Sequence, residues 1–243
     1  MEIHIVDDYR EMSEKAAAFV AEQLRDKNNS VLGLATGSTP EGMYKKLVEM
    51  YKKSCLDFSM VTTFNLDEYV GLSPEHPQSY YAYMHKHFLN HTNIKPENIN
   101  LPCLNENEAD ITRVCRDYDQ KIDRAGGIDL QILGIGVNGH IGFNEPAKSL
   151  PVGTYLVELS AETIEANSRF FSSPEEVPRK AITMGIGPIM HAKKILLLAS
   201  GKSKATAIRD SFKGYVTTEV PASLLQLHSN SIILIDKDAA SLL

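Results

Sequence analysis

The chain has few cysteines, more acidic than basic residues and no long apolar run. Its three cysteines are widely spaced, which fits neither a disulfide framework nor a zinc knuckle. The formal net charge of -6 argues against a nucleic-acid surface, since such a surface shows as a basic patch or stripe. No apolar stretch approaches the ~18 residues of a membrane span, so no membrane partner is expected. The cysteines are Cys55, Cys103 and Cys115.

Segments that would export or divide the chain are also missing. The N-terminus has no basic segment before an apolar one, so we expect no secretory signal and predict a cytoplasmic protein. No linker rich in Gly, Ser or Pro, no internal repeat and no low-complexity tract interrupts the 243 residues. Because 43% of the residues are hydrophobic, the chain can form a sizeable core, and we predict a single domain over residues 1–243.

Short apolar runs alternate with helical patterns along the chain, which is typical of an α/β protein. The predicted strands are 3–6, 31–35, 61–65, 128–133, 155–159, 181–184, 194–199 and 231–235. The predicted helices are about 9–27, one that starts at Pro40, 78–89, 106–124, 161–171 and one that ends near Phe212. We predict that the strands form one open, mostly parallel Rossmann-like sheet with helices on both faces.

The stretch 134–145, GIGVNGHIGFNE, directly follows the apolar run 128–133. That run is typical of a strand buried on both faces, so the polar residues after it lie at the strand's carboxyl end. Ligands of open α/β sheets bind at this edge, which makes the stretch a candidate site. Its polar side chains are Asn138, His140, Asn144 and Glu145.

A dinucleotide-binding site is an alternative interpretation of this stretch. Gly134, Gly136 and Gly139 match G-x-G-x-x-G, and Glu158 follows about twenty residues later. However, that motif requires a helix to begin at the third glycine, and Pro146 follows soon after in a pattern that is not helical. We therefore expect the glycines to let the backbone turn sharply and approach a small substrate.

The turn after strand 31–35 is rich in hydroxyl groups. It consists of Thr36, Gly37, Ser38 and Thr39, and we expect Thr39 to cap the helix that Pro40 begins. An ordinary N-cap is one explanation, but backbone N–H groups and hydroxyls at a helix N-terminus also bind anions. The turn lies at the same sheet edge as the stretch 134–145, which favours an anion site.

Acidic residues also follow strand 61–65. Asp67 and Glu68 reach the same edge, and although loop carboxylates are commonly solvated, one placed there is a natural general base. His85 and His87 are two residues apart on a predicted helix and would face apart, so they indicate no metal site.

Basic residues follow strand 194–199 and lie in a region farther upstream. The segment SGKSK at 200–204 is not a nucleotide P-loop, because the first glycine of that motif would fall at Leu196. We interpret Lys204 as a second anion contact, the alternative being an ordinary surface lysine. Residues 159–182 are sparse in large aliphatic side chains and contain Arg169, and we predict a mobile lid there.

Five motifs occur in order: LATGSTPEGMY, FNLDEYVGL, GIGVNGHIGFNEPA, NSRFF, and SGKSKA followed by LQLH. With them the chain resembles the glucosamine-6-phosphate deaminase family, also called glucosamine-6-phosphate isomerase, over nearly its full length. The resemblance implies an open sheet of the deaminase/ribose-phosphate isomerase/CoA-transferase-like type and no cofactor or metal. The implied reaction converts glucosamine 6-phosphate and water to fructose 6-phosphate and ammonia.

This implied reaction assigns roles to the candidate residues. By resemblance Asp67 is the base that moves a proton from C2 to C1, and Glu68 positions its loop. His140 suits the proton relay of ring opening because an imidazole can both take and give a proton near neutral pH, and Glu145 and Asn138 would hold its ring and tautomer. The predicted contacts to the substrate phosphate are Thr36, Gly37, Ser38, Thr39, Arg169 and Lys204.

Two other functions share this architecture. A 6-phosphogluconolactonase has a similar fold and glycine-histidine loop, but the segment NLDEY and the NEP after His140 favour the deaminase. A sugar-phosphate sensor of a transcription regulator would need a DNA-binding helix-turn-helix, for which there is no room before the first helix, and the acidic charge speaks against it. Ammonia release from glucosamine 6-phosphate would separate the three.

The chain departs from one branch of the resembled family. Members that form hexamers and respond to N-acetylglucosamine 6-phosphate carry basic residues after the position of Glu145 and a longer C-terminal segment. Here Tyr155 and Val157 hold the positions of the basic residues, and the chain stops at Leu243. Asn138 stands where those members carry an Asp, and we expect the carbonyl oxygen of Asn138 to accept the N–H of the His140 imidazole. Without these basic residues, the charge of an effector's phosphate at a subunit interface would be poorly neutralised. We therefore predict a monomer with hyperbolic kinetics.

Overall fold

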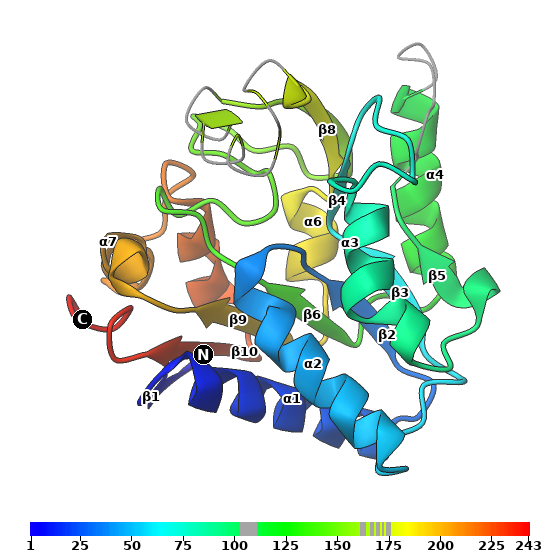
Figure 1. Cartoon of the computed structure of the whole chain (residues 1–243). Coiled ribbons are helices and arrows are strands. Elements are labelled where there is room, and N and C mark those ends of the chain that lie inside the picture. Colours follow the sequence, from blue (N-terminus) through cyan, green and yellow to red (C-terminus); the bar gives the residue numbers. More distant parts are fainter. Residues whose placement is uncertain (103–110, 161–163, 166–167, 169–170, 172, 174–175) are drawn as a thin grey trace.

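The computed structural model describes residues 1–102, 111–160, 164–165, 168, 171, 173 and 176–243. Its centre is a seven-stranded sheet whose neighbouring strands are all parallel, in the order β1-β10-β9-β6-β2-β3-β5 (Figure 1). The strands are β1 (Glu2–Val6), β10 (Ser231–Asp236), β9 (Ile195–Ala199), β6 (Leu130–Leu133), β2 (Val31–Leu34), β3 (Thr62–Asn65) and β5 (Ile99–Asn100). The predicted open, mostly parallel α/β sheet is confirmed.

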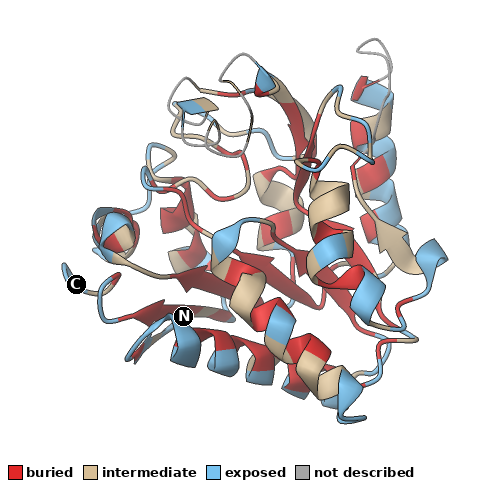
Figure 2. Ribbon diagram, in the orientation of Figure 1, coloured by how far each residue is buried: buried red, intermediate tan, exposed pale blue. Residues whose placement is uncertain are grey.

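The central strands are apolar because both faces of the sheet are covered. Every residue of β2, β6 and β9 is buried, as expected for parallel strands between two helical layers. Figure 2 shows this concentration of buried positions in the middle of the sheet. At the edge, β1 is mostly exposed, and it pairs with β10 alone among the described strands.

Helices cover the two faces of this sheet. Figure 1 shows α1 and α2 together on one side and α4 and α6 on the other. The rings of Phe64 in β3 and Tyr118 in α4, with centroids 5.6 Å apart, attach α4 to its face. The helices are α1 (Tyr9–Asp26), α2 (Ser38–Lys52), α3 (Tyr80–His87), α4 (Ile111–Arg124), α6 (Ile186–Met190) and α7 (Ala205–Phe212), with 3-10 turns η1 (Leu89–His91), η2 (Pro96–Asn98), η5 (Lys202–Lys204) and η6 (Pro221–Leu227). No helix in the described ranges has the length and apolar character to cross a bilayer.

The predicted start of α2 was wrong. The helix begins at Ser38, and Gly37 is its N-cap with a φ of 98°, a conformation that favours glycine. Thr39 therefore lies inside the first turn and does not cap it. The predicted helices 106–124 and 161–171 lie partly outside the described residues.

Three segments form a second, antiparallel sheet instead of joining the first. It consists of β4 (Asp67–Tyr69), β8 (Lys180–Thr183) and β7 (Tyr155–Glu158), in the order β4-β8-β7. The prediction of a single sheet was wrong, because an apolar run shows that a segment can pair but not which strand it pairs with. The small sheet supplies the strand that begins with Asp67.

One residue connects the two sheets. The Leu66 N–H donates to the carbonyl of Leu34 at the end of β2, 3.0 Å away, and its own carbonyl accepts the N–H of Met184, 2.7 Å away. The small sheet therefore starts at the carboxyl edge of the large one. At this edge β2 and β6 are neighbours whose connections lead in opposite directions, to β3 and toward β9. Such a topological switch point is where open α/β sheets bind ligands.

Candidate active site

The loop after β6 turns without forming a helix. Residues 134–147 contain turns and no helical residue, so the dinucleotide-binding alternative lacks the helix that it needs. A β-carbon on Gly136 would lie 2.3 Å from the His140 ring, and Gly139 has a φ of 87°. The glycines thus let the imidazole pack against the backbone of its own loop.

His140 is held by a carboxylate that is itself held by an amide. Its Nδ1 lies 3.2 Å from Oε2 of Glu145, and Nδ2 of Asn138 donates to the same oxygen at 2.7 Å. The Asn138 carbonyl oxygen accepts the backbone N–H of His140 at 3.2 Å. The prediction that this oxygen accepts the N–H of the imidazole was therefore wrong. Asn138 therefore acts on the ring through Glu145. With the proton on Nδ1, the lone pair of Nε2 can accept a proton.

Asp67 is a buried carboxyl group at the start of β4, with 6% of its surface exposed. Burial, together with the negative charge of Glu68, raises the pKa of Asp67 to about 8. Desolvation disfavours the ionised form, and the ionised carboxylate is a correspondingly stronger base.

Glu68 is fully buried and supports the backbone beside Asp67. Its carboxylate accepts the N–H groups of Tyr69, Tyr80 and Tyr81 at 2.8, 3.0 and 2.8 Å. Tyr80 and Tyr81 begin α3, so Glu68 satisfies N–H groups that a helix start leaves unpaired. Burial raises the pKa of Glu68 while these three bonds oppose the shift. This arrangement agrees with a positioning role for Glu68.

The register of the small sheet places Asp67 against the glycine loop. Asp67, Thr183 and Tyr155 are direct partners across β4, β8 and β7 and so project from one face. The Thr183 hydroxyl accepts the N–H of Phe143 at 3.1 Å. A β-carbon on Gly142 would lie 3.1 Å from Oγ1 of Thr183 and 3.6 Å from Oδ2 of Asp67. The structure thus brings the predicted base to the loop that carries His140.

Tyr155 is a second contact between this row and the loop. Its hydroxyl lies 3.4 Å from both the Phe143 carbonyl and Oδ1 of Asn144. Burial, together with the charge of Glu145, raises the pKa of Tyr155 to about 12. Sequence reasoning missed these contacts of Tyr155 and Thr183, because strand pairing between distant segments leaves no mark in a local pattern.

Two tyrosines hold the turn 36–39 at the carboxyl end of β2. The Tyr83 hydroxyl donates to the Gly37 carbonyl at 2.6 Å, and the Tyr9 hydroxyl donates to the Ser38 carbonyl at 2.9 Å. Within the described chain no side chain caps the first N–H groups of α2. The backbone N–H groups at the positive N-terminal end of α2 can therefore donate to a bound anion.

Lys204 lies at the carboxyl side of β9, at the end of η5 and directly before α7. Asp236 holds the preceding loop, since its carboxylate accepts the Ser200 hydroxyl and, at 3.1 Å, the Gly201 N–H. A φ of 90° at Gly201 turns the chain there. Lys204 thus lies after the carboxyl end of β9, at the same edge of the sheet as the other candidate residues. Its contact with the substrate phosphate stays a prediction.

Arg169, the remaining predicted phosphate contact, lies outside the described residues. Some of the predicted lid, 159–182, is described. Leu159 is buried in a cluster with Tyr69, and the Phe171 ring lies 6.1 Å from the Tyr69 ring. This part of the segment packs beside the strand of Asp67, and its motion as a lid stays a prediction.

Together these groups form a proton-transfer site beside an anion-binding turn. A buried carboxyl group with a raised pKa faces a loop that carries an imidazole-carboxylate pair. No group of three His, Cys, Asp or Glu in the described residues could hold a metal ion. The fold and site define a class: an open α/β protein with acid-base groups and donors for an anion at one sheet edge.

Comparison with known proteins gives the family. The family model for glucosamine-6-phosphate isomerases and 6-phosphogluconolactonases matches residues 7–234, and the chain belongs to this family. It is 60% identical over 243 residues to a glucosamine-6-phosphate deaminase of Thermoanaerobacter sp. (strain X514), covering 100% of this chain and 95% of the relative. A glucosamine-6-phosphate deaminase of Halothermothrix orenii is 59% identical, with 100% of both chains covered.

Solved structures agree with this assignment. A monomeric glucosamine-6-phosphate deaminase superposes with a TM-score of 0.96 at 47% identity over 100% of both chains. A 6-phosphogluconolactonase from Trypanosoma brucei has a TM-score of 0.78 at 18% identity, covering 99% of this chain and 97% of that one. At that identity the second likeness shows the fold alone.

Proposed function

We propose that this protein is a glucosamine-6-phosphate deaminase. It converts glucosamine 6-phosphate and water to fructose 6-phosphate and ammonia by ring opening, aldose-ketose isomerisation and deamination. The proposal is supported by the activity named for relatives 57 to 60% identical over nearly the whole chain. The site adds the acid and base groups that such a reaction needs.

The pyranose ring opens first. His140 takes the proton of the C1 hydroxyl through its free Nε2 and returns a proton to the ring oxygen as the C1–O5 bond breaks. Glu145 stabilises the imidazolium that forms between these two steps, because its carboxylate accepts the Nδ1–H. Asn138 fixes this carboxylate by donating to the same oxygen.

Asp67 then moves a proton between two adjacent carbons. As a carboxylate it removes the proton from C2, and O1 takes up a proton, which gives an enolamine with a double bond between C1 and C2. Asp67 then returns the proton to C1, which leaves an iminium group at C2. Water adds to this iminium carbon, a proton passes from the new hydroxyl group to the nitrogen, and ammonia leaves, which yields the C2 ketone of fructose 6-phosphate. The raised pKa of Asp67 suits both directions of transfer, since the group must be a base and then an acid.

The phosphate group is bound at the edge of the large sheet. The turn 36–39 offers backbone N–H groups at the start of α2, which has no side-chain cap. Lys204 supplies a positive charge from the loop after β9, and Arg169 supplies another from the predicted lid.

The observation that carries the mechanism is the placement of Asp67 beside Gly142 on the loop of His140. The test adds glucosamine 6-phosphate to the purified protein and measures ammonia and fructose 6-phosphate. We expect both in equal amounts. Hydrolysis of 6-phosphogluconolactone without ammonia release would identify a lactonase, and binding without turnover would identify a sensor.

We further propose that the enzyme acts as a monomer without an activator. A solved relative that is 47% identical is a monomeric deaminase. Tyr155 fastens the glycine loop from the small sheet, 3.4 Å from the Phe143 carbonyl. Tyr155 is uncharged and so offers no cation for the phosphate of an effector.

A further inference from the structure

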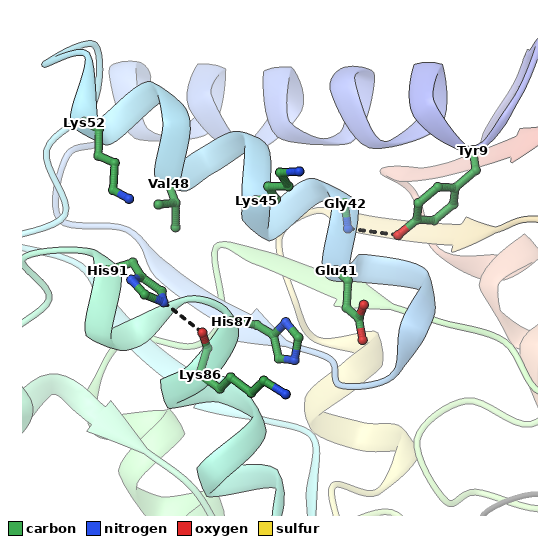
Figure 3. Close-up of a pocket in the computed structure, with 9 residues that line it drawn as sticks. All are labelled: Tyr9, Glu41, Gly42, Lys45, Val48, Lys52, Lys86, His87 and His91. Atoms are coloured by element: carbon green, nitrogen blue, oxygen red, sulfur yellow. Dashed lines mark hydrogen bonds between the residues drawn. The ribbon is translucent and has the colours of Figure 1, made fainter. Parts of the chain in front are cut away.

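A cleft of about 430 Å³ lies between α2 and α3, and none of its lining residues is a proposed catalytic or phosphate-binding residue (Figure 3). Lys45 and Lys52 line it from α2. Lys86 and His87 line it from α3, and His91 from the turn that follows. A volume of this size accommodates a small ligand.

The charge of this cleft is positive although the chain is acidic. Three of the nine lining residues are lysines and one, Glu41, is a carboxylate. Among the described residues, Lys45, Lys52 and Lys86 have no ion-pair partner. Lys46 of the same helix, which does not line the cleft, is paired with Glu14 at 3.2 Å and Glu49 at 3.5 Å. Three lysines without an ion-pair partner among the described residues thus line one cleft, on a chain whose net charge is -6.

The spacing of the lysines indicates an elongated anion. Lys45 and Lys52 are seven residues apart, about 10 Å along one side of α2, with Val48 between them. Lys86 lies across from them on α3 (Figure 3). A chain of two or three phosphoryl groups spans this separation and can contact all three ammonium groups without drawing the lysine side chains together onto one phosphate. His91 donates from Nε2 to the Lys86 carbonyl at 2.8 Å and so fixes this wall.

The cleft is connected to the two tyrosines that hold the turn 36–39, to one directly and to the other through His87. Tyr9 lines it directly, and the ring of His87 lies 4.5 Å from the ring of Tyr83. These tyrosines bind the carbonyls of Ser38 and Gly37. A ligand that bridges α2 and α3 would restrain the turn from both sides.

We propose that this cleft binds small molecules that carry two or more linked phosphoryl groups, and that the bound ligand tightens binding of the sugar phosphate through Tyr83. The ammonium groups of Lys45, Lys52 and Lys86 contact the phosphoryl oxygens. When the ligand holds α3 against α2, the turn 36–39 is already restrained. The turn then loses less conformational entropy when the substrate binds.

Isothermal titration of the whole protein with inorganic tripolyphosphate tests the binding, with saturating fructose 6-phosphate present to occupy the proposed active site. We expect one site at low ionic strength and an affinity at least ~10-fold weaker in the double variant Lys52→Gln/Lys86→Gln. Lys53→Gln, which changes an exposed neighbouring lysine outside the cleft, is the matched control. No binding by the wild type, or equal binding by the folded double variant, overturns the proposal.

Steady-state kinetics tests the coupling, which rests on the proposed function. Saturating tripolyphosphate should lower KM for glucosamine 6-phosphate about fivefold at unchanged kcat. Tyr83→Phe should still bind tripolyphosphate, but its KM should no longer respond. An unchanged or raised KM in the wild type overturns the coupling. Absence of ammonia release without tripolyphosphate would instead count against the deaminase assignment and leave the binding result intact.

Discussion

Asp67 and Thr183 stand directly opposite each other in the antiparallel pair β4–β8, and the Thr183 hydroxyl accepts the N–H of Phe143 in the glycine loop. The same pair of strands thus holds the proposed base and anchors the loop of His140. Their relative position is set by strand register, because a shift of one residue would turn both side chains to the other face.

Asp67→Asn should abolish most of the deaminase activity. The amide cannot take the proton from C2, and general base catalysis is worth ~10²–10⁴-fold in rate. The variant should still bind fructose 6-phosphate, because the phosphate contacts are intact. Coupled assay of ammonia gives kcat, and a variant that kept more than about half of the wild-type rate would show that the base is another group.

The same substitution should stabilise the protein in a pH-dependent way. The pKa of Asp67 is raised from 3.8 to about 8 in the folded state, so protonation favours folding. This stabilisation is complete below pH 3.8 and is lost as the pH rises toward 8. Asn stays neutral, so the gain in unfolding free energy over the wild type should grow by roughly 2–4 kcal/mol between about pH 5 and pH 8.

Urea unfolding at the two pH values measures this gain. Asp57→Asn is the control, because Asp57 is exposed and bonds to Asn93 and Ser59 lower its pKa. Asp57→Asn should give no gain on raising the pH. A gain for Asp67→Asn that is equal at both pH values would mean that the carboxyl group is not protonated in the folded enzyme.

Thr183→Val should lower kcat about 10-fold with little change in KM. Valine preserves the shape but leaves the Phe143 N–H without its acceptor, at a cost of about 1–3 kcal/mol that a shift of the loop can relieve. Thr183→Ser retains the hydroxyl and should restore most of kcat. Equal losses in Val and Ser variants of similar stability would indicate a packing role for the methyl group instead.

Lys204→Ala should raise KM by about 10- to 100-fold, since one charge-assisted contact contributes ~1.5–3 kcal/mol. Arg169→Ala should act in the same direction. Both effects should be confined to 6-phosphorylated sugars. Lys202→Ala, which removes an exposed lysine of the same turn, is the control. Unchanged KM in both Lys204 and Arg169 variants would place the phosphate elsewhere.

Rates should depend hyperbolically on glucosamine 6-phosphate and should not respond to N-acetylglucosamine 6-phosphate. Tyr155, whose hydroxyl lies 3.4 Å from the Phe143 carbonyl of the glycine loop, is uncharged and offers no cation to the phosphate of an effector. Saturation curves with and without the effector, together with a mass measurement in solution, check this. Sigmoidal curves that become hyperbolic with the effector, on a hexamer, would contradict the monomer proposal.

The sequence by itself determined the α/β class, most element positions and the identity of the candidate groups. Apolar runs without alternation predict strands buried on both faces, and polar residues directly after them must lie at the carboxyl edge of a parallel sheet. This local logic was sufficient to propose Asp67, His140 and Glu145 as candidates, and to discount a dinucleotide site. The prediction succeeds because the apolar run and the strand that it predicts lie in the same few residues.

Tertiary structure alone decided how these groups are held and charged. The separate small sheet, the partnership of Asp67 with Thr183 and the two tyrosines on the turn 36–39 join segments far apart in the chain. A hydrogen-bond partner is chosen among all groups within reach, which is why Asn138 bonds to Glu145 and not to the imidazole. The pKa of Asp67 likewise depends on burial by neighbours from several elements, and no local pattern encodes that burial.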